Sequence, residues 1–154
     1  MPWAAGVTDR LFLDANVLFT AAHRPHGKAA FLFTIAARGP NPPWQMFSSA
    51  YAAEEARRNL QAKFPAALSD WPAIVARLRV VPQPGMPRLP LALPEKDQPI
   101  WAACHAARCT HLLTGDLKDF GPHMNQPEQT GGIVIQTVGE YLAAFLHRMK
   151  NPAP

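Results

Sequence analysis

The sequence predicts an α/β fold, a three-layer α/β/α sandwich around a central parallel β-sheet of four to five short strands. Short apolar segments alternate with helical segments along the chain, which is the element order of α/β proteins. These segments are hydrophobic without interruption, as expected for parallel strands covered on both faces. Two of them, Leu11–Leu13 and His111–Leu113, are followed closely by aspartates. Ligands of parallel sheets bind beyond the carboxyl ends of the strands, so these aspartates are candidate site residues.

The first part of the chain is predicted to form a strand, two helices and a second strand. Leu11–Leu13 is the first strand, and the next helix starts at Asn16, whose side chain can cap it. Lys28–Arg38 forms the second helix, because Gly39-Pro40 is a strong stop signal. Trp44–Phe47 forms the second strand.

The middle of the chain is predicted to be mainly helical. Ser48 or Ser49 caps a helix that runs to about Lys63, and a second helix covers residues 65–78. Arg79–Val81 is the third strand.

The last part contains two further strands between helices. A helix carries Trp101, and His111–Leu113 is the strand that follows it. A loop through Gly131-Gly132 leads to the strand Ile133–Ile135, and a last helix covers residues 138–147.

The domain organisation is predicted from length and proline content. Residues 1–150 are expected to form a single domain, and residues 151–154 a disordered tail. Residues 82–94 are rich in proline and are expected to form an extended surface loop inside that domain.

Composition limits the classes of function. The 48% hydrophobic and 17% charged content is that of an ordinary globular protein. The chain has neither the roughly 20-residue apolar run of a membrane span nor a signal peptide, so we expect a cytoplasmic protein. The net charge of +4 favours a polyanionic partner. Cys104 and Cys109 are expected on different sides of one helix as buried thiols, and the six histidines lack zinc-site spacing.

Four acidic residues stand where apolar segments end or helices begin, namely Asp14, Glu55, Asp97 and Asp116. A carboxylate at the end of an apolar element is costly unless it has a partner. If the fold brings the four together, a bound cation or protons must relieve their mutual repulsion. This pattern is typical of a metal site.

Each acid also has a structural interpretation. Asp14 can be a turn or capping residue. Glu54 lies opposite the apolar stripe of its helix and can pair with Arg58 in solvent, whereas Glu55 lies on the flank of the stripe and is the better site candidate.

The remaining two positions leave similar alternatives. Pro99 must lie in the first turn of its helix, which makes Asp97 a plausible N-cap. Asp119 follows Asp116 by three residues and can either share a cation with it or close a short turn.

Four motifs in order, F-L-D-A-N-V-L-F, E-A-R-R-N-L, D-x-x-I-W-A-A-C and L-L-T-G-D-L-K-D-F, resemble the PIN domain family of metal-dependent ribonucleases. The resemblance extends from about residue 11 to residue 147 and depends on the order of the motifs. It implies a PIN-like sheet between helices, an acidic pocket that binds Mg²⁺ or Mn²⁺, and cleavage of RNA. Many bacterial members are toxins, so an antitoxin protein and a second copy of the chain are the implied protein partners.

The resemblance also assigns residues. The acids of the family fall on Asp14, Glu55, Asp97 and Asp116, with Asp119 as an accessory acid and Asn16 and Thr114 as supporting polar positions. Carboxylate oxygens without His or Cys suit Mg²⁺ or Mn²⁺. A metal-activated water would then attack the scissile phosphorus. The cations expected to hold the RNA backbone are Arg57, Arg58, Lys63 and Lys118.

Three alternatives stay open at this point. The first is a catalytically inactive PIN-like module that binds nucleic acid or acts as a scaffold, and it should bind no metal. The second is a phosphatase with Asp14 as nucleophile, although such enzymes generally have an acid two residues later, where this chain has Asn16. In the third, all the acids are caps and turns.

Overall fold

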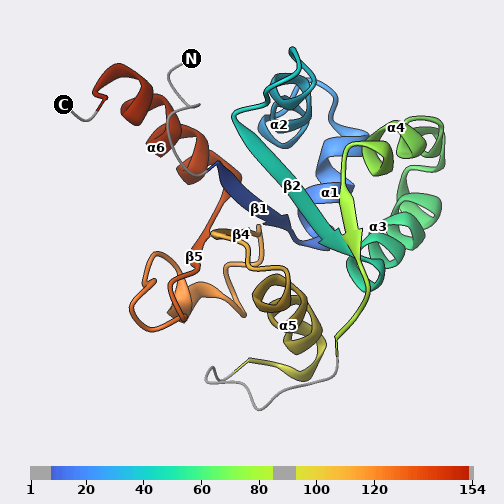
Figure 1. The fold of residues 1–154 in the computed structure, drawn as a ribbon. Helices are drawn as coiled ribbons and strands as arrows, with labels where there is room; N and C mark the ends of the chain where they lie inside the picture. Colours follow the sequence, from blue (N-terminus) through green and yellow to red (C-terminus); the bar gives the residue numbers. More distant parts are fainter. Residues whose placement is uncertain (1–7, 85–92, 153–154) are drawn as a thin grey trace.

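A five-stranded sheet, parallel throughout, runs through the part of the chain described by the computed structural model, residues 8–84 and 93–152. The strand order is β3-β2-β1-β4-β5, with β1 at the centre (Figure 1). This confirms the predicted parallel sheet. The strands are β1 (Asp9–Leu13), β2 (Trp44–Ser49), β3 (Arg79–Val81), β4 (His111–Leu113) and β5 (Val134–Gln136).

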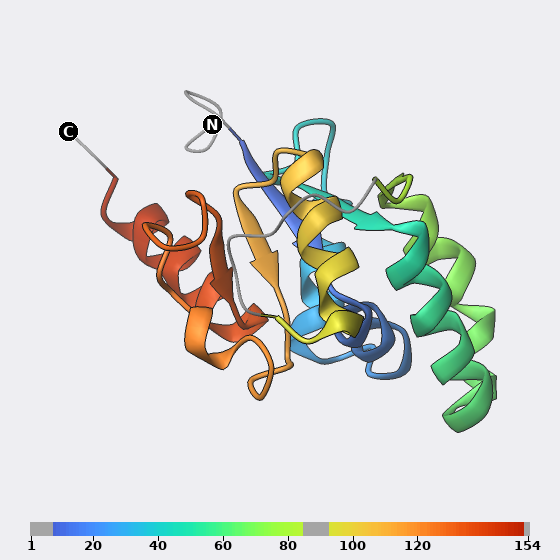
Figure 2. The same cartoon turned by 90° about the horizontal axis from the view of Figure 1, so that it is seen from below.

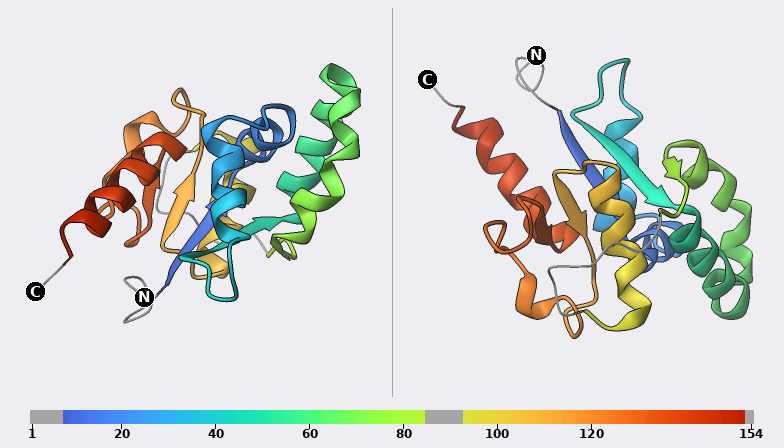
Figure 3. Two further views of the ribbon diagram at one scale, coloured as in Figure 1. Left: turned by 90° about the horizontal axis from the view of Figure 1, so that it is seen from above. Right: turned by 60° about the horizontal axis from the view of Figure 1, so that its bottom comes forward.

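Helices cover both faces of the sheet, which confirms the three-layer arrangement. The α2 and α6 helices lie on one face, in front of the strands in the left panel of Figure 3, and α5 lies on the other face, in front of them in Figure 2. The α1 helix packs against α2 and α3. The α-helices are α1 (Ala15–His23), α2 (Lys28–Ala36), α3 (Ala50–Lys63), α4 (Trp71–Ala76), α5 (Gln98–Ala106) and α6 (Val138–Lys150). The short 3₁₀ helices are η1 (Pro65–Ser69), η2 (Glu95–Asp97) and η3 (Gly121–His123).

The register between β1 and β4 determines which residues meet at the carboxyl edge of the sheet. Leu13 of β1 pairs with Leu113 of β4, and both side chains are fully buried. The next residues, Asp14 and Thr114, are therefore neighbours, and the Asp14 backbone N–H donates to the Leu113 carbonyl at 3.1 Å. Apolar burial thus fixes the position of the polar residues that follow it.

Two capping residues link strands directly to helices. Asp14 caps α1, with Oδ1 accepting from the Ala15 N–H at 2.7 Å, so the prediction that Asn16 is the cap is wrong. Ser49 caps α3, as one of the two predicted serines, by accepting from the Ala52 N–H at 3.1 Å. Because α3 begins at once after β2, Glu55 on its second turn stays close to the carboxyl edge of the sheet.

The helix predicted over residues 65–78 is interrupted. It consists of η1 and then α4, which starts at Trp71 with Pro72 in its first turn. Proline has no N–H and clashes with the carbonyl four residues back, so the helix cannot pass continuously through Pro72. Elsewhere the predicted boundaries shift slightly. The α2 helix ends two residues early, β5 begins one residue late and α6 extends three residues further.

The two cysteines are free and buried, as expected, but α5 does not carry both. The helix ends at Ala106, and the chain turns at Arg108, whose φ is 55°. The Cys109 N–H then donates to the Cys104 carbonyl at 3.2 Å. Burial, with the neighbouring Cys109 thiol as a further cause, raises the pKa of Cys104 well above its ordinary value.

Parts of the predicted proline-rich loop and tail lie outside the described residues, namely 85–92 and 153–154. The flank of the loop is held by a hydrogen bond from Gln83 Nε2 to the Pro99 carbonyl at 3.1 Å. Over residues 8–84 and 93–152, the helices are all too short or too polar to cross a lipid bilayer.

The Ser49 cap of α3 gives a stability prediction. Ser49→Ala removes the side-chain acceptor of the Ala52 N–H, so the free energy of unfolding should fall by about 1 kcal/mol in urea denaturation. The control is Ser69→Ala, because the exposed Ser69 hydroxyl only donates to the Ala66 carbonyl. Its effect should stay within about 0.5 kcal/mol. Equal losses in the two variants would contradict the capping role.

Candidate metal centre

An acidic pocket of about 300 Å³ opens at the carboxyl edge of the sheet. Four separate parts of the chain line it: the start of α1, the middle of α3, η2 and the loop after β4. The carboxylates in the lining are those of Asp14, Glu55, Asp97 and Asp116. The remaining lining residues are Ala15, Asn16, Phe19, Asn59, Lys63 and Lys96. The fold therefore places the four acids named from the sequence in one pocket.

A buried hydroxyl connects the two strand-end aspartates. Thr114 Oγ1 donates to Asp14 Oδ2 at 2.8 Å and accepts from the Asp116 N–H at 3.0 Å. Asn16 completes the network, with Nδ2 donating to Asp14 Oδ2 at 3.1 Å and Oδ1 accepting from the Gly115 N–H at 2.7 Å. The two predicted supporting residues thus hold the ends of β1 and β4 in fixed relation.

Asp97, Asp116 and Asp119 form the tightest group of acids. One carboxylate oxygen of each lies within 4.8 Å of those of the other two. Asp116 Oδ1 also accepts from the Asp119 N–H at 3.0 Å, so a turn bond and proximity of the carboxylates occur together. Both alternatives considered for Asp119 are compatible with this geometry.

The surroundings of Asp97 show whether the pocket residues fit a metal ion. Asp97 stands at the N-cap position of α5, as predicted, but its side chain makes no capping hydrogen bond. The residue is 7% exposed, and its Oδ2 is buried with no hydrogen-bond partner among the described residues. A buried carboxylate oxygen without a partner is costly. Oxygen-only donors suit Mg²⁺ or Mn²⁺, so these residues fit such an ion.

Lys96 lines the acidic pocket and was missed by the sequence-based prediction. Its Nζ lies 3.1 Å from Asp119 Oδ2 and 4.0 Å from Asp116 Oδ2, although most of its side chain is exposed. The hydrogen bond that Lys96 donates to Asp119 raises the pKa of this ammonium, so it is charged at neutral pH. In the sequence, Lys96 is distinguished only by its position next to Asp97, and that position does not show where its side chain points.

Burial, and then the neighbouring acids, shift the pKa values of the carboxyl groups. Burial raises the pKa of Asp14, and the negative charges of Glu55 and Asp116 add to the shift against hydrogen bonds from Thr114 and Ala15. Burial likewise raises the pKa of Asp97 to about 7, helped by its hydrogen bond with Asp119. That hydrogen bond lowers the pKa of Asp119, so the two carboxyls share one proton at mildly acidic pH.

The four cations predicted to hold RNA lie at different distances from the pocket. Lys63 lines it, and Lys118 is exposed in the loop two residues after Asp116. Arg57 and Arg58 lie outside the lining and interact with Glu54, at 2.6 Å and 4.0 Å. Glu54 is thus the ion-pairing residue of the Glu54-Glu55 pair, as predicted, with Arg57 as its closer partner.

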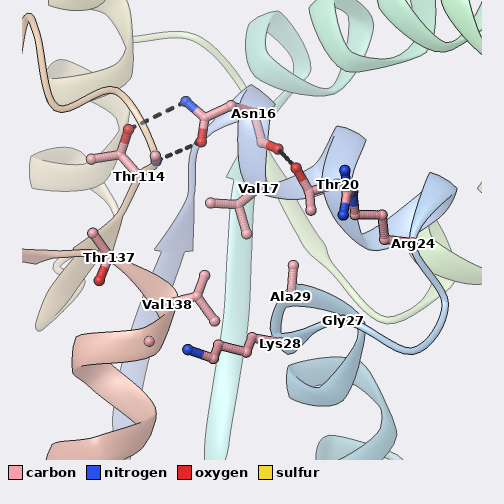
Figure 4. A pocket seen from close by; sticks show the side chains of 12 residues that line it. Asn16, Val17, Thr20, Arg24, Gly27, Lys28, Ala29, Thr114, Thr137 and Val138 are labelled. Carbon is pink, nitrogen blue, oxygen red and sulfur yellow. Dashed lines mark hydrogen bonds between the residues drawn. The ribbon is translucent and has the colours of Figure 1, made fainter.

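A second pocket, of about 360 Å³, adjoins the first and shares Asn16 with it. Figure 4 shows it between α1, the start of α2 and the start of α6. Arg24 and Lys28 contribute the positive charges of its lining, and Thr114 lines the side nearest to the acids. Cations therefore flank the acidic pocket on this side.

The raised pKa of Asp97 predicts a pH dependence of stability without metal. The pKa of Asp97 in the folded protein, about 7, exceeds its ordinary value of 3.8, so the folded state binds more protons between these values. The free energy of unfolding should therefore fall as pH rises through that range. Urea denaturation in EDTA should show a loss of at least about 1 kcal/mol between pH 5 and 8.

The matched variants are Asp97→Asn and Asp70→Asn. Asp97→Asn should remove most of this loss and be the more stable protein at pH 8, because the amide carries no charge to bury. Asp70 is exposed and lies outside the acidic pocket, so Asp70→Asn should keep the wild-type profile. A wild-type profile in Asp97→Asn would show that another group causes the loss.

Comparison with known proteins gives the fold. No family model and no curated protein sequence matches this chain. Among solved structures, VapBC2 from Rickettsia felis, bound to a DNA fragment from its promoter, aligns with 12% identity and a TM-score of 0.56 over 83% of this chain and 98% of that chain. VapBC-1 from nontypeable Haemophilus influenzae aligns with 11% identity and a TM-score of 0.52 over 84% and 98% of the two chains.

Both alignments span nearly the whole of the other chain, and at these identities they show a common fold. A third structure, VapC20 of Mycobacterium tuberculosis, a sarcin–ricin loop cleaving toxin, aligns with 14% identity and a TM-score of 0.47 over 66% of this chain and 86% of that chain. Together with the parallel five-stranded sheet, the first two alignments confirm the fold predicted from the resemblance: this chain has the PIN-domain fold.

Proposed function

We propose that the protein is an endoribonuclease that depends on Mg²⁺ or Mn²⁺ and hydrolyses phosphodiester bonds of RNA. One observation carries the proposal: carboxylates from four distant parts of the chain share one pocket, and one of their oxygens is buried without a partner. A group of like charges is unfavourable unless a ligand offsets it. The motifs that resemble the PIN family support the choice of RNA, and the fold shared with two VapBC proteins agrees with that family.

The acids of the pocket would hold the cation. Asp97, Asp116 and Asp119 are close enough to bind one ion together, and Asp14 and Glu55 complete the pocket directly or through water. Bound there, the ion would supply Lewis-acid stabilisation of the negative charge that develops on the phosphodiester.

The chain's own residues would position and hold the substrate. Thr114 and Asn16 keep the Asp14 carboxylate turned toward the pocket through their hydrogen bonds. Lys63 and Lys96 bring positive charge to the same lining, where they would bind phosphates of the RNA backbone. The pocket is open to solvent, so water can enter it and act as the nucleophile of hydrolysis.

We further propose that the protein is the toxin half of a toxin–antitoxin pair, with a homodimer as its expected assembly. The support is the fold shared with two VapBC proteins and the net charge of +4, which suits an acidic inhibitor. Co-expression with the product of the gene immediately upstream should relieve growth arrest caused by this chain. Growth arrest that persists with every neighbouring gene product would contradict this pairing.

Replacement of Asp116 tests the catalytic proposal. Asp116→Asn should reduce cleavage of a labelled RNA in Mn²⁺ to the level seen in EDTA, because the amide is a much poorer ligand than a carboxylate. Circular dichroism should remain unchanged, since an amide oxygen can still accept from the Asp119 N–H. The exposed Asp70→Asn variant is the charge-matched control and should cleave normally.

Two results would overturn the nuclease proposal. One is a wild-type cleavage rate in Asp116→Asn, which would place the activity elsewhere or in a contaminant. The other is the absence of Mn²⁺ binding to the wild-type protein in calorimetry, which would favour the inactive nucleic-acid-binding or scaffold module.

The ammonium of Lys96 predicts a change in metal affinity. Lys96→Gln removes a positive charge 3.1 Å from Asp119 Oδ2, so Mn²⁺ should bind about two- to fivefold more tightly in calorimetry. Lys150→Gln, at the end of α6, changes the net charge equally and should leave the affinity unchanged. Weaker binding in Lys96→Gln would instead show that Lys96 organises the acids for the ion.

A further inference from the structure

We infer that an aromatic cluster beside the acidic pocket, formed by Phe19, His23 and Phe64, is a stacking platform for an unpaired base of the RNA. The inference rests on the proposed ribonuclease function and deepens it. The platform would bind a nucleotide next to the cleaved bond and would favour unpaired over duplex RNA.

The three rings form one continuous surface from two helices. Phe19 and His23 lie one turn apart on α1, with ring centroids 4.5 Å apart. Phe64, directly after α3, stacks on His23 with centroids 4.3 Å apart and an interplanar angle of 7°. The Phe19 and Phe64 centroids are 5.7 Å apart. Phe19 is tilted by 55° against His23 and by 48° against Phe64, so His23 and Phe64 are the parallel pair. Aromatic rings gathered in this way form an apolar surface of the kind on which bases stack.

The cluster continues the surface of the acidic pocket. Phe19 lines that pocket together with Asp14, Glu55 and Lys63. Phe64 leaves 44% of its surface exposed although it lies within the cluster. A strand whose phosphate is held at the carboxylates would therefore have a neighbouring base within reach of these rings. Covering an exposed ring with a flat base would remove apolar surface from water.

The charges around the rings favour a nucleic acid over an apolar protein segment. Lys63 Nζ lies 5.9 Å from the centroid of the Phe19 ring. Burial and the adjacent Arg24 lower the pKa of His23, which favours its neutral ring. Arg24 also lines the second pocket with Lys28, as Figure 4 shows. Aromatic rings next to cations are the combination that single-stranded nucleic acids bind.

The geometry selects unpaired bases. Stacking on the platform requires a base whose face is free, and bases inside a duplex already stack on their neighbours. The cluster would therefore contribute to binding of single strands and loops and would contribute nothing to binding of a continuous duplex.

The test compares Phe64→Ala with Phe31→Ala, because Phe31 on α2 is also 44% exposed and lies outside the cluster. Binding of a fluorescein-labelled, unstructured RNA of about 12 nucleotides is measured by anisotropy in EDTA, where metal-dependent cleavage cannot occur. Phe64→Ala should weaken binding about tenfold. Phe31→Ala and Phe64→Trp should bind as the wild type does.

The salt dependence of binding separates stacking from charge. Phe64→Ala should leave the slope of log affinity against log salt unchanged, because no phosphate contact is lost. Lys63→Gln should reduce that slope by about one. A hairpin-free duplex of the same length should bind equally to the wild type and to Phe64→Ala.

Three outcomes would overturn the inference. They are wild-type RNA affinity in Phe64→Ala, an equal loss in Phe31→Ala, and an equal loss for duplex RNA. Unchanged RNA binding combined with lost binding of the upstream gene product would identify the cluster as a protein-docking surface instead. Because binding is measured without metal, it stays informative even if Asp116→Asn leaves cleavage intact and the nuclease proposal fails.

Discussion

Repulsion between carboxylates at one edge of the sheet is the constraint around which this structure is organised. The register of β1 and β4 aligns Asp14 with Thr114, and Asp116, two residues later, lines the same pocket as Asp14. The Thr114 hydroxyl binds both residues, since it donates to the Asp14 carboxylate and accepts from the Asp116 backbone N–H. The arrangement is therefore held by the sheet and not by attraction among the acids, which is what a preformed ligand site requires.

Two features of the chain reduce this repulsion in part. The first is a proton, because the pKa of Asp97 rises to about 7 and its carboxyl group shares a proton with Asp119. The second is the Lys96 ammonium, 3.1 Å from Asp119 Oδ2. Asp97 Oδ2 nevertheless stays buried without a hydrogen-bond partner among the described residues. A divalent cation would displace the proton, compete with the ammonium and satisfy the remaining oxygen, so one ligand accounts for three separate features.

Local sequence features were enough to predict the sheet and the positions of the acids, but not the groups that approach them from elsewhere. Uninterrupted apolar runs indicated buried parallel strands, and Asp14 follows one of those strands directly, whereas Asp116 follows another after two residues. The helix predicted over residues 65–78 is interrupted because Pro72 must lie in the first turn of α4. Lys96 and Phe64 could not be assigned, because their positions depend on how η2 lies beside the loop after β4 and how the end of α3 lies beside α1. Such contacts depend on tertiary structure, which spacing along the chain does not encode.

The structural and functional interpretations of Asp14, treated as alternatives at the level of sequence, are compatible in three dimensions. Its Oδ1 caps α1 through the Ala15 N–H, while Oδ2 accepts from Thr114 and Asn16. An ionised carboxylate has about four acceptor sites, so three hydrogen bonds leave room for one more ligand. The start of α1 also favours a negative charge through the helix dipole. The capping bond therefore orients the carboxylate and helps keep it ionised despite its burial, so that the residue which begins the helix can also face the pocket as a ligand.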